Sequence, residues 1–278
     1  SIKNITNDPC DLLSCRGLRQ GAIMIGAIAG DIIGSVYEGH NIKTTEFPLF
    51  DPRCTYTDDT VLTVAVADAI LSAEEYGPKL KEWYRLFPGR GYGSGFRQWA
   101  VHGDGQGHSM GNGSAMRVSP VGFAFTTLEE VLGEARKSAL PSHNHPEGIK
   151  GAQAVASAIF LARTGKSKTD IKTYIQNTFG YNLGRTIDDI RPRYPFDATC
   201  PGSVPEAITA FLESDNYEDA VRKAISLGGD SDTIACMAGG IAEAFYGVPD
   251  YIRTRVLKEL DDRLKIILDT FMAKYLRV

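Results

Sequence analysis

The chain has 278 residues with 43% hydrophobic content, and its 30 basic and 34 acidic side chains give a net charge of −4. Such a chain can form a full globular core, and the lack of a long basic run argues against nucleic acid or a membrane surface as its main partner. The five cysteines are scattered without a CxxC pair, so we expect no disulfide framework, no thiolate zinc site and a cytoplasmic location.

Helices are the predicted elements along nearly the whole chain. Residues 1–19 show no hydrophobic period and are predicted to be a disordered extension. Residues 20–278 are predicted to form a single domain, because no linker, repeat or low-complexity tract divides them. The apolar spacing is helical and no β-α-β rhythm appears, so the expected fold is all-α and compact. Helices are expected over residues 59–76, 128–139, 146–163, 168–179, 205–213, 217–227, 233–245 and 251–275.

The segment of residues 26–38, GAIAGDIIGSVYE, combines small residues with two acidic ones. The small residues permit close helix packing, which alone could account for the glycines. Asp31 and Glu38 lie two helical turns apart and therefore share one face of a helix. We expect Glu38 to reach a metal or an attacking water, and Asp31 to brace the site.

The motif YTDDT at residues 56–60 opens the next predicted helix. Thr and Asp at a helix N-terminus satisfy free N–H groups and favour the helix dipole, so capping alone could explain this motif. One residue is enough for capping, however. The adjacent carboxylates of Asp58 and Asp59 repel each other unless a cation lies between them.

The motif GGDSDT at residues 228–233 precedes an apolar helix. A glycine-rich turn with an N-cap is again the simpler interpretation. Yet Asp230 and Asp232 lead into a buried segment, where two carboxylates are costly without a counter-charge. Oxygen ligands without a nearby His or Cys favour Mg²⁺ or Mn²⁺ over Zn²⁺. The two motifs together therefore predict a site for two divalent metal ions.

Five motifs, in their order along the chain, resemble those of the ADP-ribosylglycohydrolase family. They are GDIIGSVYEG at residues 30–39, YTDDT at 56–60, GNGSAMR at 111–117, SHNHPEG at 142–148 and GGDSDTIACMAGG at 228–240. The resemblance covers the chain from Gly21 to its C-terminal end. It implies a compact orthogonal multi-helix bundle of the ADP-ribosylglycohydrolase type.

The resemblance implies a binuclear metal site and its catalytic residues. Its six metal ligands would be Thr57, Asp58 and Asp59 for one ion, Asp230 and Thr233 for the other, and Asp232 bridging both. Glu38 corresponds to the acidic residue beside the reacting ribose carbon. The implied catalytic residues are Glu38, Asp59 and Asp232, and the implied cofactors are two divalent ions, Mg²⁺ first and Mn²⁺ as the alternative.

The resemblance also implies where the substrate lies. Residues 107–114 match a loop whose backbone N–H groups hold a pyrophosphate, and an ordinary flexible loop remains the alternative for residues 103–107. The implied substrate contacts are Glu38, Ser109, Met110, Gly111, Asn112, Gly113 and His143. Ser109 is a departure from the arginine-specific bacterial members, which carry Asp there. The serine- or O-linked branch of the family therefore fits this chain better.

The hypothesis that follows is a metal-dependent hydrolase that cleaves the bond to the anomeric carbon of ADP-ribose by attack of a metal-oriented water. Its expected partners are ADP-ribose and ADP-ribosylated proteins or small molecules, without membrane or nucleic acid, and a monomer is compatible with the sequence. The alternative is a catalytically inactive ADP-ribose-binding or structural relative. All six implied metal ligands are present, which favours the enzyme. The leaving group stays open among arginine, serine, guanidine, acetate, a nucleobase and a poly(ADP-ribose) unit.

Overall fold

The computed structural model describes residues 23–103 and 105–276, so the extension predicted for residues 1–19 lies outside the described residues. Within those two ranges the structure is all-helical, with two isolated β-bridges and no strand, which confirms the predicted fold class. No described helix is long and apolar enough to cross a membrane. In chain order the helices are α1 (Ile25–Glu38), α2 (Asp58–Ser72), α3 (Tyr76–Leu86), α4 (Ser94–His102), α5 (Gly113–Met116), α6 (Ser119–Ala124), α7 (Leu128–Ala139), α8 (Pro146–Arg163), α9 (Lys168–Phe179), α10 (Ile187–Ile190), η1 (Arg191–Arg193), α11 (Cys200–Leu212), α12 (Tyr217–Ser226), α13 (Ser231–Tyr246), α14 (Asp250–Glu259) and α15 (Asp262–Tyr275).

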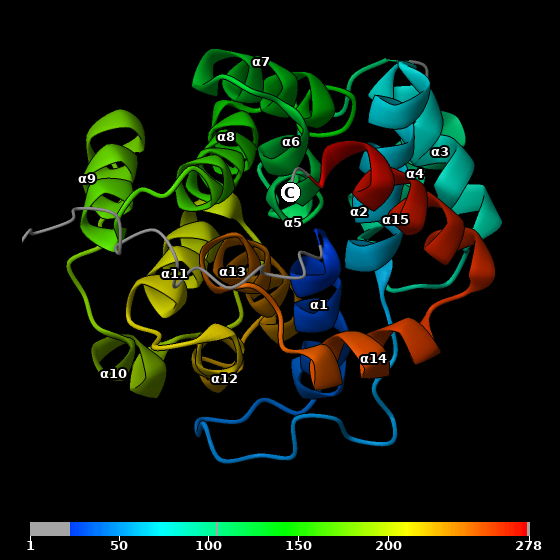
Figure 1. Ribbon diagram of the computed structural model, residues 1–278. Helices are drawn as coiled ribbons and strands as arrows, with labels where there is room; N and C mark the ends of the chain where they lie inside the picture. Colours follow the sequence, from blue (N-terminus) through cyan, green and yellow to red (C-terminus); the bar gives the residue numbers. More distant parts are fainter. Residues whose placement is uncertain (1–22, 104, 277–278) are drawn as a thin grey trace, which may run out of the picture.

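Helices α1 and α13 pack against each other near the centre of the molecule (Figure 1). Their close approach depends on glycine. A Cβ atom on Gly30 would lie 2.1 Å from the carbonyl oxygen of Ala235, and one on Gly34 would lie 2.5 Å from the Cα atom of Asp232. Any larger residue would force the two helices apart, because packed interiors leave no room for such overlap. The contact brings the acidic residues of α1 next to the first turn of α13.

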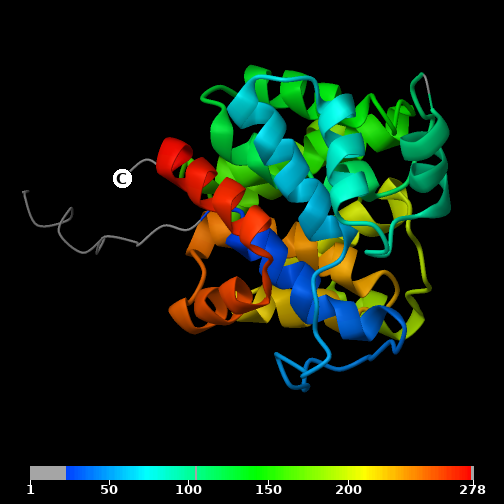
Figure 2. The ribbon, with the colours of Figure 1, turned by 90° about the vertical axis from the view of Figure 1, so that its right-hand side faces the viewer.

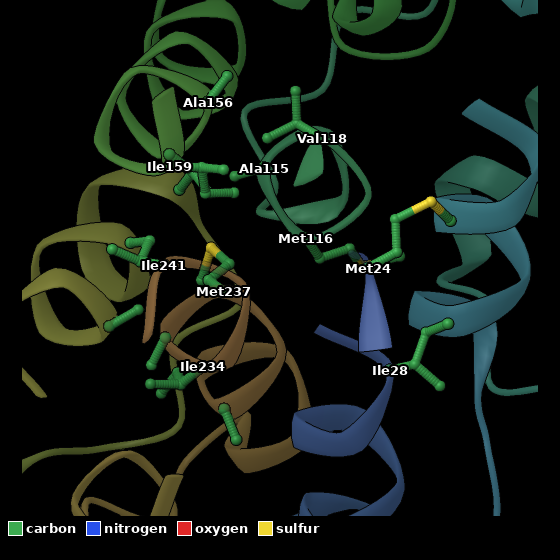
Figure 3. Close-up of a cluster of buried hydrophobic side chains, with 14 of the residues drawn as sticks. Met24, Ile28, Ala115, Met116, Val118, Ala156, Ile159, Ile234, Met237 and Ile241 are labelled. Atoms are coloured by element: carbon green, nitrogen blue, oxygen red, sulfur yellow. The ribbon is translucent and has the colours of Figure 1, made fainter. Parts of the chain in front are cut away.

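Apolar side chains from several helices fill the space around this pair (Figure 3). Ile28 of α1, Ile159 of α8 and Ile234 of α13 are fully buried. Burial of one such side chain stabilises the fold by about 1.5–3 kcal/mol, so this cluster holds the central helices in a fixed arrangement. The short helix α5 contributes Ala115 and Met116 to the same cluster, and it is therefore anchored beside α13.

The remaining helices surround the centre in groups. Helices α7 and α8 pack on each other, α11 and α12 pack on α13, and α2 packs on α3 and α15 (Figure 1). Turned by 90°, the molecule shows α15 lying across the front of the bundle (Figure 2). Helix α14 packs on α1. The three cysteines in the described ranges, Cys54, Cys200 and Cys236, are buried and free.

Three of the predicted helices, over residues 128–139, 146–163 and 168–179, have the predicted bounds. The prediction of a helix over 59–76 is wrong at its end, because α2 stops at Ser72 and Ala73 adopts a left-handed φ of 55°. The single helix predicted over 251–275 is wrong as well. The chain is extended at Leu260, and Asp261 caps a new helix by accepting a hydrogen bond from Arg263 N–H.

Candidate metal and catalytic site

The acidic motifs meet where the N-termini of α2 and α13 lie beside α1. Thr57 is the N-cap of α2, and Asp230 occupies the corresponding position before α13. The N-terminus of a helix carries the positive end of its dipole, which favours nearby carboxylates. The hydroxyl of Thr233 donates to Oδ2 of Asp59 at 3.2 Å, so the two N-termini are in direct contact.

Asp31 organises the turn that begins α2. Its fully buried carboxylate accepts hydrogen bonds from the N–H of Thr57 at 3.0 Å and the hydroxyl of Thr57 at 2.7 Å. It also accepts from the N–H of Thr60 at 3.0 Å and from the hydroxyl of Thr60. Because these bonds engage both carboxylate oxygens, Asp31 is better placed to brace the YTDDT motif than to serve as a free ligand.

Asn41 holds the glycine turn before α13. Gly228 and Gly229 both have a φ of 70°, a conformation that glycine adopts without steric cost. The Oδ1 atom of Asn41 accepts from the N–H of Gly229 at 2.7 Å. Its Nδ2 atom donates to the carbonyl of Gly229 at 3.0 Å and to that of Glu38 at 2.9 Å. One side chain therefore connects the end of α1 to the turn that carries Asp230.

Asn112 orients Asp230 from the opposite side. Its Nδ2 atom donates to Oδ2 of Asp230 at 2.7 Å and lies 3.2 Å from the hydroxyl of Ser203. Asn112 was predicted to contact the substrate; it lines the cleft, and its amide also donates to a predicted metal ligand. The structure thus gives this asparagine a positioning contact that sequence reasoning missed.

The carboxylates form two groups that share one member. Oxygen atoms of Asp31, Asp59 and Asp232 lie within 4.8 Å of one another, and so do those of Glu38, Asp230 and Asp232. Asp232 belongs to both groups, which is the position expected of a bridging ligand.

Burial and mutual repulsion act against ionisation of these groups. Burial raises the pKa of Asp58 to about 8, and neighbouring carboxylates add to the rise. The pKa values of Asp59 and Asp232 are raised well above the usual value by burial first and then by like charges. Partial burial, followed by the charge of Asp230, raises the pKa of Glu38. These carboxylates can all be ionised together only beside a strong positive charge.

The side chains present fit a divalent cation. Oδ1 of Asp59 is buried and has no hydrogen-bond partner, which is costly for a carboxylate oxygen unless a ligand completes its environment. Among the ion pairs of the described residues, none neutralises Asp58, Asp59, Asp230 or Asp232. Carboxylate and hydroxyl oxygens are the ligands that Mg²⁺ and Mn²⁺ prefer.

A cleft of about 570 Å³ opens from the carboxylates to the glycine-rich loop. It is lined by nearly all the predicted site residues: Glu38, Thr57, Asp58, Asp59, Ser109, Gly111, Asn112, Gly113, His143, Asp230, Asp232 and Thr233. Met110, also predicted to contact the substrate, is not among its lining residues. Its side chain is 41% exposed, and its carbonyl accepts from the N–H of Cys200 at 2.9 Å. Sequence reasoning missed Phe96, Trp99 and Phe196, which give the cleft an aromatic wall.

Backbone amides of the glycine-rich loop are partly engaged within the protein. The N–H of Gly111 donates to the hydroxyl of Ser109 at 3.0 Å, and the N–H of Asn112 donates to the carbonyl of Ala198 at 2.9 Å. These two amides already have partners within the protein, and the pyrophosphate contact predicted for the loop as a whole stays a prediction. His143 lies against the same loop: a Cβ atom on Gly113 would be 3.1 Å from its Nε2 atom.

A larger hollow, of about 1100 Å³, lies between α2, α3 and α7. Two of its three acidic lining residues, Glu74 and Glu134, already have partners, and the third is Glu75. Glu74 pairs with Lys79, and Glu134 pairs with Lys137 and accepts from the hydroxyl of Tyr76. The smaller cleft, with its unpaired carboxylates, is therefore the better candidate for chemistry.

Comparison with known proteins identifies the family of the chain. Residues 19–277 match the family described as ADP-ribosylglycohydrolase. ADP-ribosylhydrolase ARH3 of Xenopus tropicalis is 30% identical over 302 residues, which cover 81% of this chain and 86% of that protein. ADP-ribosylarginine hydrolase Tri1 of Pseudomonas putida is 27% identical over 219 residues, which cover 69% and 59%. A solved structure described as an ADP-ribosylglycohydrolase-related protein complex is similar in fold, with a TM-score of 0.69, 24% identity and coverage of 91% and 96%.

Proposed function

The chain belongs to the ADP-ribosylglycohydrolase family and is an ADP-ribosylhydrolase, and we propose that it uses divalent metal to release ADP-ribose from O-linked conjugates. One observation carries this proposal. The buried, unpaired carboxylates, including the unpartnered Oδ1 of Asp59, lie at one end of a cleft large enough for a nucleotide-sized ligand.

The proposed metal ligands are the hydroxyls and carboxylates that the two helix N-termini bring together: Thr57, Asp58, Asp59, Asp230, Asp232 and Thr233. Mg²⁺ is the proposed cofactor and Mn²⁺ the alternative, with Asp232 shared between two ions. When bound, such ions polarise ribose oxygens and lower the pKa of a coordinated water.

Glu38 is the proposed general base. Its carboxylate lies with those of Asp230 and Asp232 and is more exposed than either, so a water at the anomeric carbon can reach it. The raised pKa of Glu38 makes it a stronger proton acceptor than an ordinary carboxylate. Glu38 would accept one proton of the attacking water as the bond from the anomeric carbon to the leaving oxygen breaks, and that proton would then pass to the leaving oxygen, giving ADP-ribose and a free hydroxyl.

An O-linked leaving group is proposed from the chemistry of the rim. A guanidinium leaving group would need a carboxylate that is free of metal. Ser109 stands where arginine-specific bacterial members are expected to carry Asp, and its hydroxyl accepts from the N–H of Gly111. Glu38 is then the one lining carboxylate outside the proposed ligand set among the described residues, and it is assigned to the water.

The test is ADP-ribose release from proteins mono-ADP-ribosylated on serine or on arginine, with Mg²⁺ or Mn²⁺, for wild type and Asp232→Asn. We expect release from serine by the wild type, and loss of both turnover and metal binding in Asp232→Asn with helical content unchanged. Asp269→Asn, an exposed change on α15, is the matched control. Turnover retained in Asp232→Asn would contradict the mechanism, and ADP-ribose binding without turnover by the wild type would favour an inactive relative.

A further inference from the structure

Three largely buried side chains that line the cleft form a hydrogen-bonded chain. Nη2 of Arg117 donates to the hydroxyl of Ser142 at 2.9 Å and to the carbonyl of Ser138 at 2.9 Å. The hydroxyl of Ser142 lies 2.7 Å from Nδ1 of His143. Arg117 is fully buried, and Ser142 and His143 are 4% and 5% exposed, so water does not compete for these bonds.

The direction of these bonds follows from the donors and acceptors. A guanidinium can only donate, so the oxygen of Ser142 accepts from Arg117 and its own proton must find another acceptor. Among the described residues, Nδ1 of His143 is the neighbour within hydrogen-bond distance. If His143 instead donated from Nδ1, the hydroxyl proton of Ser142 would be buried without a partner, which is unfavourable.

We propose that Arg117 and Ser142 are positioning residues that hold His143, already a substrate contact implied by the family resemblance, in the neutral form protonated at Nε2, so that this N–H faces the diphosphate of the bound nucleotide. The ligand identity rests on the proposed function, whereas the tautomer does not. The tautomer is decided by the hydrogen bond that the other ring nitrogen makes.

The surroundings of Nε2 indicate what it binds. His143 lines the cleft, and Nε2 lies against the glycine-rich loop, 3.6 Å and 3.1 Å from where Cβ atoms on Gly111 and Gly113 would be. No hydrogen bond of Nε2 occurs within the described residues. Since the amides of Gly111 and Asn112 already donate within the protein, Nε2–H supplies a donor for an anionic oxygen at this point. Any side chain on Gly113 would obstruct that approach.

Burial and the adjacent guanidinium keep the ring neutral. The pKa of His143 is lowered well below its usual value, first by burial and then by the charge of Arg117. A neutral ring has one N–H only, so the relay decides which nitrogen carries it. This makes Ser142, which itself lines the cleft, a determinant of which ring nitrogen of His143 can donate to the ligand.

The first test is the long-range ¹⁵N–¹H spectrum of the wild-type protein without ligand. We expect His143 to show the Nε2-protonated neutral pattern. In Ser142→Ala the two tautomers should mix, and Ser142→Thr, which keeps the hydroxyl, should restore the wild-type pattern. Ser138→Ala is the matched control, because that buried hydroxyl bonds only to the carbonyl of Ala135. An Nδ1-protonated ring in the wild type would overturn the relay.

The second test measures ADP-ribose affinity and steady-state rates in the same variants. Loss of the directed donor in Ser142→Ala should weaken ADP-ribose binding about fivefold to tenfold. KM should rise by the same factor with kcat nearly unchanged, because a diphosphate contact is made equally in the ground and transition states. Unchanged affinity in Ser142→Ala would overturn the inference. A wild type with the expected spectrum that neither binds nor cleaves ADP-ribose conjugates would instead refute the proposed function and the assigned ligand.

Discussion

Replacement of Gly34 by alanine tests whether the contact between α1 and α13 sets the geometry of the site. The added Cβ atom would lie 2.5 Å from Cα and 2.8 Å from N of Asp232, and 2.9 Å from the carbonyl oxygen of Ser231. All three are backbone atoms in the first turn of α13, so no side-chain rotation can relieve the overlap. The helices must separate, and Asp232 must move with its helix.

The size of the displacement follows from ordinary contact distances. A Cβ atom needs at least 3.4 Å, so the nearest backbone atom must retreat by about 0.9 Å. Overpacking of this kind destabilises a protein by about 1–3 kcal/mol, which lowers Tm by about 3–10 °C. A shift of about 1 Å in a catalytic group reduces the rate by about 100-fold. Gly34→Ala should therefore lower the catalytic rate by a larger factor than its loss of stability alone would explain.

The assay combines thermal melting with ADP-ribose release by Gly34→Ala. Gly133→Ala is the control, because a Cβ atom there meets nothing within 4 Å and alanine favours the helix α7. We expect the control to keep wild-type activity with an equal or higher Tm. If Gly34→Ala kept wild-type kcat/KM and metal affinity, the close approach of α1 to α13 would not control the position of Asp232.

Three further predictions concern the carboxylates. Mg²⁺ or Mn²⁺ at about 100 times its Kd should raise Tm by about 5–10 °C, and EDTA should reverse that rise. Calorimetry should give a stoichiometry of two ions per chain. An unchanged Tm would contradict a metal site. Without metal, in EDTA, the pKa of Asp58 is about 8 in the folded state and 3.8 in the unfolded state. Between these two pH values the folded protein therefore keeps a proton on Asp58 that the unfolded protein has lost. Stability should then fall as pH rises from about 4 to about 8, measured by urea unfolding; a rise over this range would contradict it. Glu38→Gln should lower kcat by about 100-fold to 10,000-fold while metal still raises Tm, and an unchanged kcat would remove Glu38 as the base.

The fold was predictable where local signals are strong. Helix α7 begins with a capping box in which Thr127 and Glu130 bond reciprocally, and α9 begins with the same device at Ser167 and Asp170. These signals lie within a few residues, so the sequence marks both helices correctly. Helix α5 has only four residues, and its position depends on packing against α8 and α13. Such short elements have too few residues for a periodic pattern to indicate them.

The candidate site was predictable in its motifs but not in its supports. The paired aspartates of YTDDT and GGDSDT stand out in the sequence, because two carboxylates so close together repel each other unless a cation lies between them. The sequence gives no comparable indication for Asn41 or Arg117. Asparagine commonly follows a helix, and a single arginine within an apolar stretch does not by itself predict a role in a site. Their roles arise from hydrogen bonds to Gly229 and Ser142, which lie 188 and 25 residues away along the chain. Contacts at such separation follow from the tertiary fold and not from local pattern.

The charge balance of the site explains why its supports matter. Four hydrogen bonds favour the charged form of Asp31, but burial outweighs them and raises the pKa of that carboxyl. If Asp31, Glu38, Asp58, Asp59, Asp230 and Asp232 were all ionised, the site would carry six negative charges. The N-termini of α2 and α13 contribute about +0.5 each, which leaves about −5. Two divalent cations would reduce this charge to about −1, whereas one cation would leave about −3. The charge balance therefore supports the proposed pair of ions over a single ion.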